Sequence, residues 1–91
     1  MISLERWSGF DKQFQLLQIG AEFERARTAE ETGIPEHKTL ALTRAVELID
    51  LTLADKKWND DRPMLEGMKK TVQEFLTEHS RRGVAVLYQA L

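Results

Sequence analysis

Five charged side chains lie at helical spacing in two neighbouring stretches of the sequence and are the first candidates for chemistry. They are Glu22, Arg25, Arg44, Glu47 and Asp50. Glu47 and Asp50 lie about one helical turn apart, and two carboxylates that close need a metal ion or a cationic ligand to offset their repulsion. A polar site between the first and second long helices would suit a small ligand-binding protein or an enzyme.

The second stretch, TRAVELIDLTLAD at residues 43–55, also has a simpler interpretation. At about 100° per residue, its apolar side chains cover an arc of roughly 160°, and the charged side chains lie on the remainder of the helix. Arg44 and Glu47 are three residues apart and can pair across one turn. The pattern therefore favours the water-facing side of a buried helix, and we predict no catalytic, cofactor-binding or metal-binding residue.

Several common kinds of site lack their residue patterns in this sequence. There is no cysteine, which excludes disulfides and thiolate metal sites. Ferritin-like metal sites need Glu-x-x-His, but Ile34 stands three residues before His37 and Leu76 three residues before His79. Phosphate-binding loops and zinc-protease motifs are also missing. We therefore expect a non-enzymatic protein that holds no cofactor.

The elements that would position these residues are all predicted to be helices. Ser8 is expected to cap a helix over residues 9–31 that ends at Gly33, and Pro35 to begin a second helix that reaches residue 57. Residues 58–63 are predicted to form a loop, with Asp60 or Asp61 capping a third helix over residues 62–82. The tail, residues 84–91, is expected to be a short fourth helix. The sequence thus predicts one all-α domain over residues 1–91, a three-helix up-down bundle with a short C-terminal fourth helix.

The first predicted helix carries apolar side chains on two nearly opposite sides. Phe10, Phe14, Leu17 and Ala21 form one stripe, and Leu16, Ile19, Phe23 and Ala26 form the other. A surface helix needs only one apolar stripe, so the second one predicts a contact with the tail or with another subunit. We expect a homodimer or a complex with another protein, and we predict these contact residues: Ile19, Phe23, Ala26, Trp58, Val84 and Leu87.

Charge and hydropathy limit the other partners. The formal net charge is −2 and the charges are spread evenly, so no segment resembles a basic nucleic-acid-binding arm. A nucleic-acid-associated adaptor would require the basic pairs at residues 56–57, 69–70 and 81–82 to share one face. The longest apolar run is far shorter than the roughly 20 residues of a membrane span. The first residues, MISLERWSGF, do not look like a signal peptide, so we expect a cytoplasmic protein without membrane contact.

Two motifs in the helices, QIGAEFERA at residues 18–26 and RAVELIDLTLAD at residues 44–55, are followed by Trp58. With these motifs the chain resembles a family of small, uncharacterised prokaryotic helical proteins with an IG-x-E…RA helix followed by RALELIDLTLAD-x-x-W. The resemblance covers residues 7–58 and implies a helical fold but no activity, so no catalytic residue follows from it. The function we expect is a protein–protein interaction or homo-oligomerisation module. The alternatives are a ligand-binding protein or enzyme with the polar site above, and a nucleic-acid-associated adaptor.

Overall fold

The computed structural model describes residues 2–77, and all of the regular structure in this range is helical. The elements are α1 (Leu4–Ser8), α2 (Lys12–Thr32), α3 (Pro35–Leu53), a 3-10 helix η1 (Lys56–Asp61) and α4 (Arg62–Thr77). The predicted all-α fold is confirmed for this part of the chain. The predicted fourth helix at residues 84–91 lies outside the described residues.

The beginning of α2 differs from the prediction. Ser8 does not cap this helix, because it is the last residue of the short helix α1. The chain turns at Gly9 and Phe10, and the carboxylate of Asp11 then accepts a hydrogen bond of 2.8 Å from the backbone N–H of Phe14. A carboxylate that binds a free N–H group of the first turn is a strong helix cap. Helix α2 therefore begins three residues later than the sequence predicted.

The boundary between α2 and α3 is as predicted, whereas the end of α3 is not. Gly33 ends α2 in the left-handed conformation at φ = 71°, and Pro35 begins α3. Left-handed backbone disfavours residues that have a Cβ atom, which explains the glycine. Helix α3 ends at Leu53, and η1 replaces most of the predicted loop. Asp55 caps η1 by accepting a hydrogen bond from the backbone N–H of Lys57.

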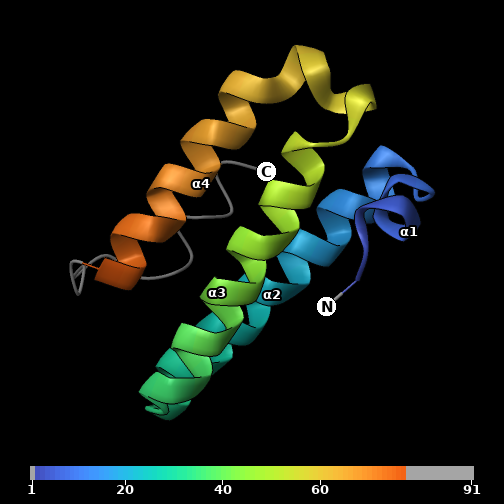
Figure 1. Ribbon diagram of the computed structural model, residues 1–91. Coiled ribbons are helices and arrows are strands. Elements are labelled where there is room, and N and C mark those ends of the chain that lie inside the picture. Colours follow the sequence, from blue (N-terminus) through green and yellow to red (C-terminus); the bar gives the residue numbers. More distant parts are fainter. Residues whose placement is uncertain (1, 78–91) are drawn as a thin grey trace.

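Helix α3 lies in the centre of the arrangement and packs against α1, α2 and α4 (Figure 1). Successive long helices run in opposite directions, so α2 and α3 form an antiparallel pair, and α4 returns along the other side of α3. One cluster of buried side chains joins the three long helices and η1. Its members are Ile19, Phe23, Ala26, Ala41, Leu42, Ala45, Ile49, Trp58, Leu65, Met68, Val72 and Phe75.

The structure corrects the predicted contact surface. The stripe of α2 that was predicted to contact a partner is buried inside the chain itself. Ile19, Phe23 and Ala26 are fully buried in the chain's own core, and Trp58 is nearly so. The opposite stripe is the exposed one: Phe14 is 39% exposed and Leu17 63%. Four of the predicted contact residues are therefore not at the surface, and the other two, Val84 and Leu87, lie outside the described residues.

Candidate functional site

Three of the five residues of the predicted polar cluster lie along one groove between α2 and α3. Glu22 and Arg25 reach it from α2, and Arg44 reaches it from α3. The other two residues do not take part. Asp50 forms an ion pair of 2.7 Å with Lys69 of α4, and Glu47 is half-buried elsewhere on α3. The predicted cluster therefore divides between two sides of α3 and does not converge on one site.

One end of this groove is a cavity of about 460 Å³ with aromatic walls. Trp7 and Phe10 meet edge to face with their ring centroids 6.1 Å apart, and the rings of Phe10 and Phe14 lie 4.5 Å apart. Trp7 is buried, whereas Phe14 is partly exposed at the rim. Leu48 of α3 adds an aliphatic side chain. This end of the groove can therefore bury an apolar side chain of a partner.

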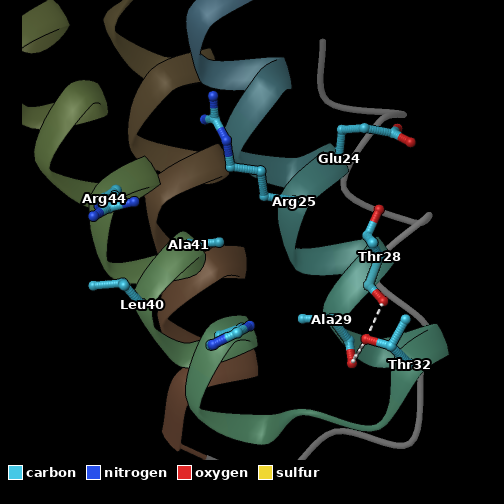
Figure 2. A pocket seen from close by; sticks show the side chains of 9 residues that line it. Glu24, Arg25, Thr28, Ala29, Thr32, Leu40, Ala41 and Arg44 are labelled. Carbon is cyan, nitrogen blue, oxygen red and sulfur yellow. Dashed lines mark hydrogen bonds between the residues drawn. The ribbon is translucent and has the colours of Figure 1, made fainter.

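The other end is a second cavity, of about 430 Å³, between the same two helices (Figure 2). Thr28 and Thr32 line it from α2, and Leu40, which is 49% exposed, lines it from α3. Arg25 and Arg44 line both cavities and so join them into one surface. We call this surface, from Phe14 and Leu48 at one end to Thr32 and Leu40 at the other, the α2–α3 groove. Figure 2 views it from the side opposite to α4.

The α2–α3 groove is lined by two carboxylates, Glu22 and Glu24, and by two guanidinium groups, those of Arg25 and Arg44. Glu22 is buried, and its Oε1 atom lies 2.9 Å from Nη1 of Arg25 without accepting a well-directed hydrogen bond. Arg44 is exposed and forms no ion pair or hydrogen bond with any residue between 2 and 77. The predicted pair between Arg44 and Glu47 is therefore wrong. Arg25 pairs with Glu22 and Glu24 pairs with Arg27, so within residues 2–77 the guanidinium of Arg44 is the one left available to an anion.

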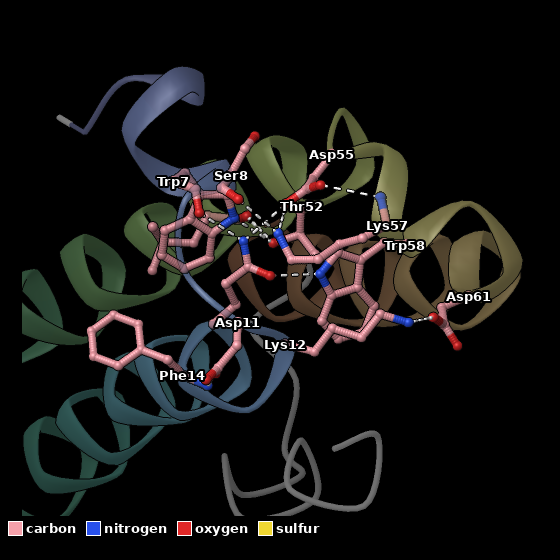
Figure 3. Close-up of polar contacts among 12 residues, drawn as sticks. Trp7, Ser8, Asp11, Lys12, Phe14, Thr52, Asp55, Lys57, Trp58 and Asp61 are labelled. Carbon is pink, nitrogen blue, oxygen red and sulfur yellow. Dashed lines mark hydrogen bonds and ion pairs between the residues drawn. The ribbon is translucent and has the colours of Figure 1, made fainter.

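A buried polar network supports the aromatic end from behind (Figure 3). Its centre is Gln15, which is fully buried on α2. The side-chain amide of Gln15 donates to the backbone carbonyl of Trp7 (2.8 Å) and to Oδ2 of Asp55 (3.0 Å), and its carbonyl accepts from the indole N–H of Trp58 (2.7 Å). The indole N–H of Trp7 donates to Oγ1 of Thr52 (3.0 Å). The network thus fastens α1 and η1 to α2 and α3, and it holds Trp7 in the groove wall.

Asp55 is the charged member of this network. Burial raises the pKa of its carboxyl, but hydrogen bonds from the side chains of Lys57 and Gln15, together with the positive charge of Lys57, outweigh that effect. As a result, the pKa of Asp55 lies below its ordinary value of 3.8. Lys57 also donates to the backbone carbonyl of Ser8 (3.0 Å). Asp55 therefore acts as a structural anion, and its partners are supplied by the chain itself.

Sequence reasoning missed the central role of Gln15. A glutamine inside a helix gives no sign that it is buried, because this residue type is usually exposed. The partners of Gln15 did leave a signal, since the sequence LTLADKKW at residues 51–58 contains both Asp55 and Trp58. These two side chains lie three positions apart at the start of η1, and both bind the same amide. That spacing was the available indication of the network.

The described part of the chain gives limited support to a metal site, a membrane-spanning helix or a nucleic-acid-binding surface. Residues 2–77 contain no group of three or more His, Asp or Glu side chains placed to hold a metal ion. No helix in this range is long and apolar enough to cross a membrane. Two of the basic side chains considered for nucleic-acid binding are paired internally, Lys57 with Asp55 and Lys69 with Asp50. The pair at residues 81–82 lies outside the described residues.

Comparisons with protein-family models, with curated proteins and with solved structures give no match to this chain. The geometry of the α2–α3 groove is therefore the basis for the functional proposal.

Proposed function

We propose that this protein is a non-enzymatic helical interaction module and that the α2–α3 groove is its contact surface. The observation that carries the proposal is the combination, along one groove, of exposed apolar side chains with a cation that has no partner among residues 2–77. Phe14 and Leu40 stand at its two ends, and Arg44 lies between them. Apolar and aromatic side chains beside an arginine are typical of protein-binding surfaces.

The polar groups of the groove favour binding over catalysis. Arginine stays protonated at physiological pH, so Arg25 and Arg44 are suited to hold an anion and not to transfer protons. The carboxylate of Glu22 is buried against Arg25.

An acid–base mechanism needs a group that gains and loses a proton within reach of the substrate and a second group that orients it. Glu24 and His37 also line the groove, but Glu24 pairs with Arg27, and no residue between 2 and 77 binds the His37 ring to orient it. We therefore prefer an interaction module to an enzyme.

A second candidate function, binding of a small anionic ligand, is favoured by one specific observation. Glu22, Arg25 and Arg44, three residues of the predicted polar cluster, line the same cavity as the aromatic side chains. Guanidinium groups next to aromatic rings can hold a small carboxylate that carries an apolar group. The open form of the groove and its continuation towards Thr32 and Leu40 make a macromolecular partner our first proposal.

Site-specific photocrosslinking in cells that naturally express the protein tests the proposal. Benzoylphenylalanine is placed at Phe14, on the rim of the groove, and in a matched variant at Gln73, which is exposed on α4. We expect a discrete crosslinked protein from position 14 and none from position 73. Equal crosslinking from both positions, or none from position 14, would refute the groove as a contact surface.

The same experiment bears on the predicted homodimer. A crosslink from position 14 to a second copy of the chain would make the module self-associating. Size-exclusion chromatography with light scattering over a range of concentrations would then give the mass of the intact protein. A dimer that dissociates when the groove residue Phe14 is replaced by serine, but not when Gln73 is, would identify the groove as the dimer interface.

A further inference from the structure

We infer that the partner of the α2–α3 groove is an acidic amphipathic helix that lies along α2 and α3. This inference rests on the proposed interaction function and adds the chemistry of the partner. Three properties of the groove lead to it: the kind of backbone that forms its floor, the distance between its apolar end and its cations, and an arginine that no residue between 2 and 77 pairs with.

The floor of the groove favours a helical partner over an extended one. It consists of two α-helices, α2 and α3, whose backbone groups are hydrogen-bonded within each helix except at the ends. Such a floor offers no row of free N–H and C=O groups to which an extended segment could pair. A partner that buries its backbone here must satisfy its own hydrogen bonds, and an α-helix does so.

The groove also has the length that a helix needs. From Phe14 to Thr32 the lining follows α2 for 18 residues, which corresponds to about 27 Å at 1.5 Å per residue. A partner helix of about 18 residues would reach both cavities. Since α4 lies on the other side of α3, a helix in the groove would pack against the side of the α2–α3 pair that no other long helix of residues 2–77 covers, as helices do in a bundle.

The unpaired guanidinium of Arg44 favours a carboxylate on that helix. Glu22 and Glu24 also line the groove, but they pair with Arg25 and Arg27, and no residue between 2 and 77 pairs with Arg44. A guanidinium group donates two parallel hydrogen bonds to the two oxygens of a carboxylate. Lysine or histidine on a partner has no such pair of acceptors. A basic partner would instead bring like charges together, which disfavours binding.

The spacing of the groove residues gives the expected pattern on the partner. Arg25 follows Phe14 by 11 residues on α2, which is three turns and about 16 Å. A partner helix that places an apolar side chain among the aromatic rings should carry a carboxylate about 11 residues away on the same face. Other apolar side chains at spacings of three and four residues should lie between them.

Selection from a displayed peptide library tests this inference without a known partner. The probe is a library of helical peptides of about 18 residues with randomised surface positions, selected for binding to the full chain. Binding of the selected peptides is then measured to the wild-type protein and to the variants Arg44→Glu, Phe14→Ser and Lys70→Glu. Lys70 is exposed on α4, so Lys70→Glu is a charge-reversal control away from the groove. Circular dichroism verifies that each variant is folded.

We expect the selected peptides to be rich in Asp and Glu at the spacing given above. Their dissociation constants should rise at least tenfold with Arg44→Glu and with Phe14→Ser, and less than twofold with Lys70→Glu. Peptides that depend on Phe14 but carry no acidic residues, or that bind Arg44→Glu as well as wild type, would overturn the acidic helix and leave the groove as a contact surface. Peptides that are insensitive to both groove variants, or a failure to select any, would refute both proposals.

Discussion

Replacement of Gln15 by methionine is expected to destabilise the fold strongly, because the buried amide joins three separate segments of the chain. The substitution keeps the length of the side chain but removes its donors and its acceptor. The indole N–H of Trp58 then has no partner in a buried site. The carbonyl of Trp7 keeps a hydrogen bond from the backbone N–H of Phe10, and Asp55 keeps those from Lys57.

The magnitude follows from these contacts. A buried donor left without a partner costs about 1–3 kcal/mol, and the two other lost hydrogen bonds contribute about 0.5–1.5 kcal/mol each. Burial of the more apolar methionine offsets part of this loss. We therefore expect the free energy of unfolding to fall by about 2–4 kcal/mol, out of the roughly 5–15 kcal/mol typical of a domain. For a domain of this size, the corresponding decrease in Tm is at least about 8 °C.

Urea unfolding followed by far-ultraviolet circular dichroism measures the effect, and Gln13→Met is the matched control. Gln13 belongs to the same helix but is exposed, so the same substitution there should change the free energy of unfolding by less than about 0.5 kcal/mol. If Gln15→Met were as stable as Gln13→Met, the network would not hold α1 and η1 in place. The argument that it positions the aromatic end of the groove would then fail.

Two further predictions concern pH and the glycines. Because the folded-state pKa of Asp55 is lowered, its carboxylate stabilises the fold above the ordinary value of 3.8, and this contribution is lost as the pH falls through the lower folded-state value. Wild type should therefore exceed Asp55→Asn in unfolding free energy at pH 7, with the difference shrinking towards pH 3; a constant difference in urea titrations would contradict this. Gly33→Ala should cost about 1–2 kcal/mol, since alanine is strained at φ = 71°. Gly67→Ala, in the exposed middle of α4 with open space around the new methyl group, should instead stabilise by about 0.5–1 kcal/mol. Thermal denaturation of both variants should thus shift Tm in opposite directions, and shifts of equal sign would refute the conformational explanation.

The sequence predicted those features that depend on local chemistry. Gly33 and Pro35 marked the boundary between α2 and α3 because their backbone preferences hold in any environment. In the sequence of α4 the apolar side chains form a single stripe, and the structure buries Leu65, Met68 and Val72 of that stripe. The caps were harder to locate, since Ser8 and Asp11 are both good capping residues only three positions apart.

The orientation of α2 could not be predicted in the same way. Both of its stripes contain apolar residues of similar size, so hydrophobicity alone does not distinguish the stripe of Phe14 and Leu17 from that of Ile19 and Phe23. The decision depends on where the other helices of the core lie, which is a property of the whole fold. The same holds for Gln15, whose burial depends on Trp58 and Asp55, residues at least 40 positions away.

The polar side of α3 shows why the predicted cluster divides. Arg44, Glu47 and Asp50 follow one another at intervals of three residues, so each is rotated by about 60° from the one before, and the outer two differ by about 120°. With α2 on one side of α3 and α4 on another, Arg44 falls beside the α2–α3 groove and Asp50 falls beside Lys69 of α4. A charge on such a helix is directed to one neighbour or to the other, and the three cannot meet at one ligand. Asp50 is thereby occupied by Lys69, whereas Arg44 lines the groove on the side of α3 away from α4 and has no partner among residues 2–77, so under our proposal it is the member that a partner binds.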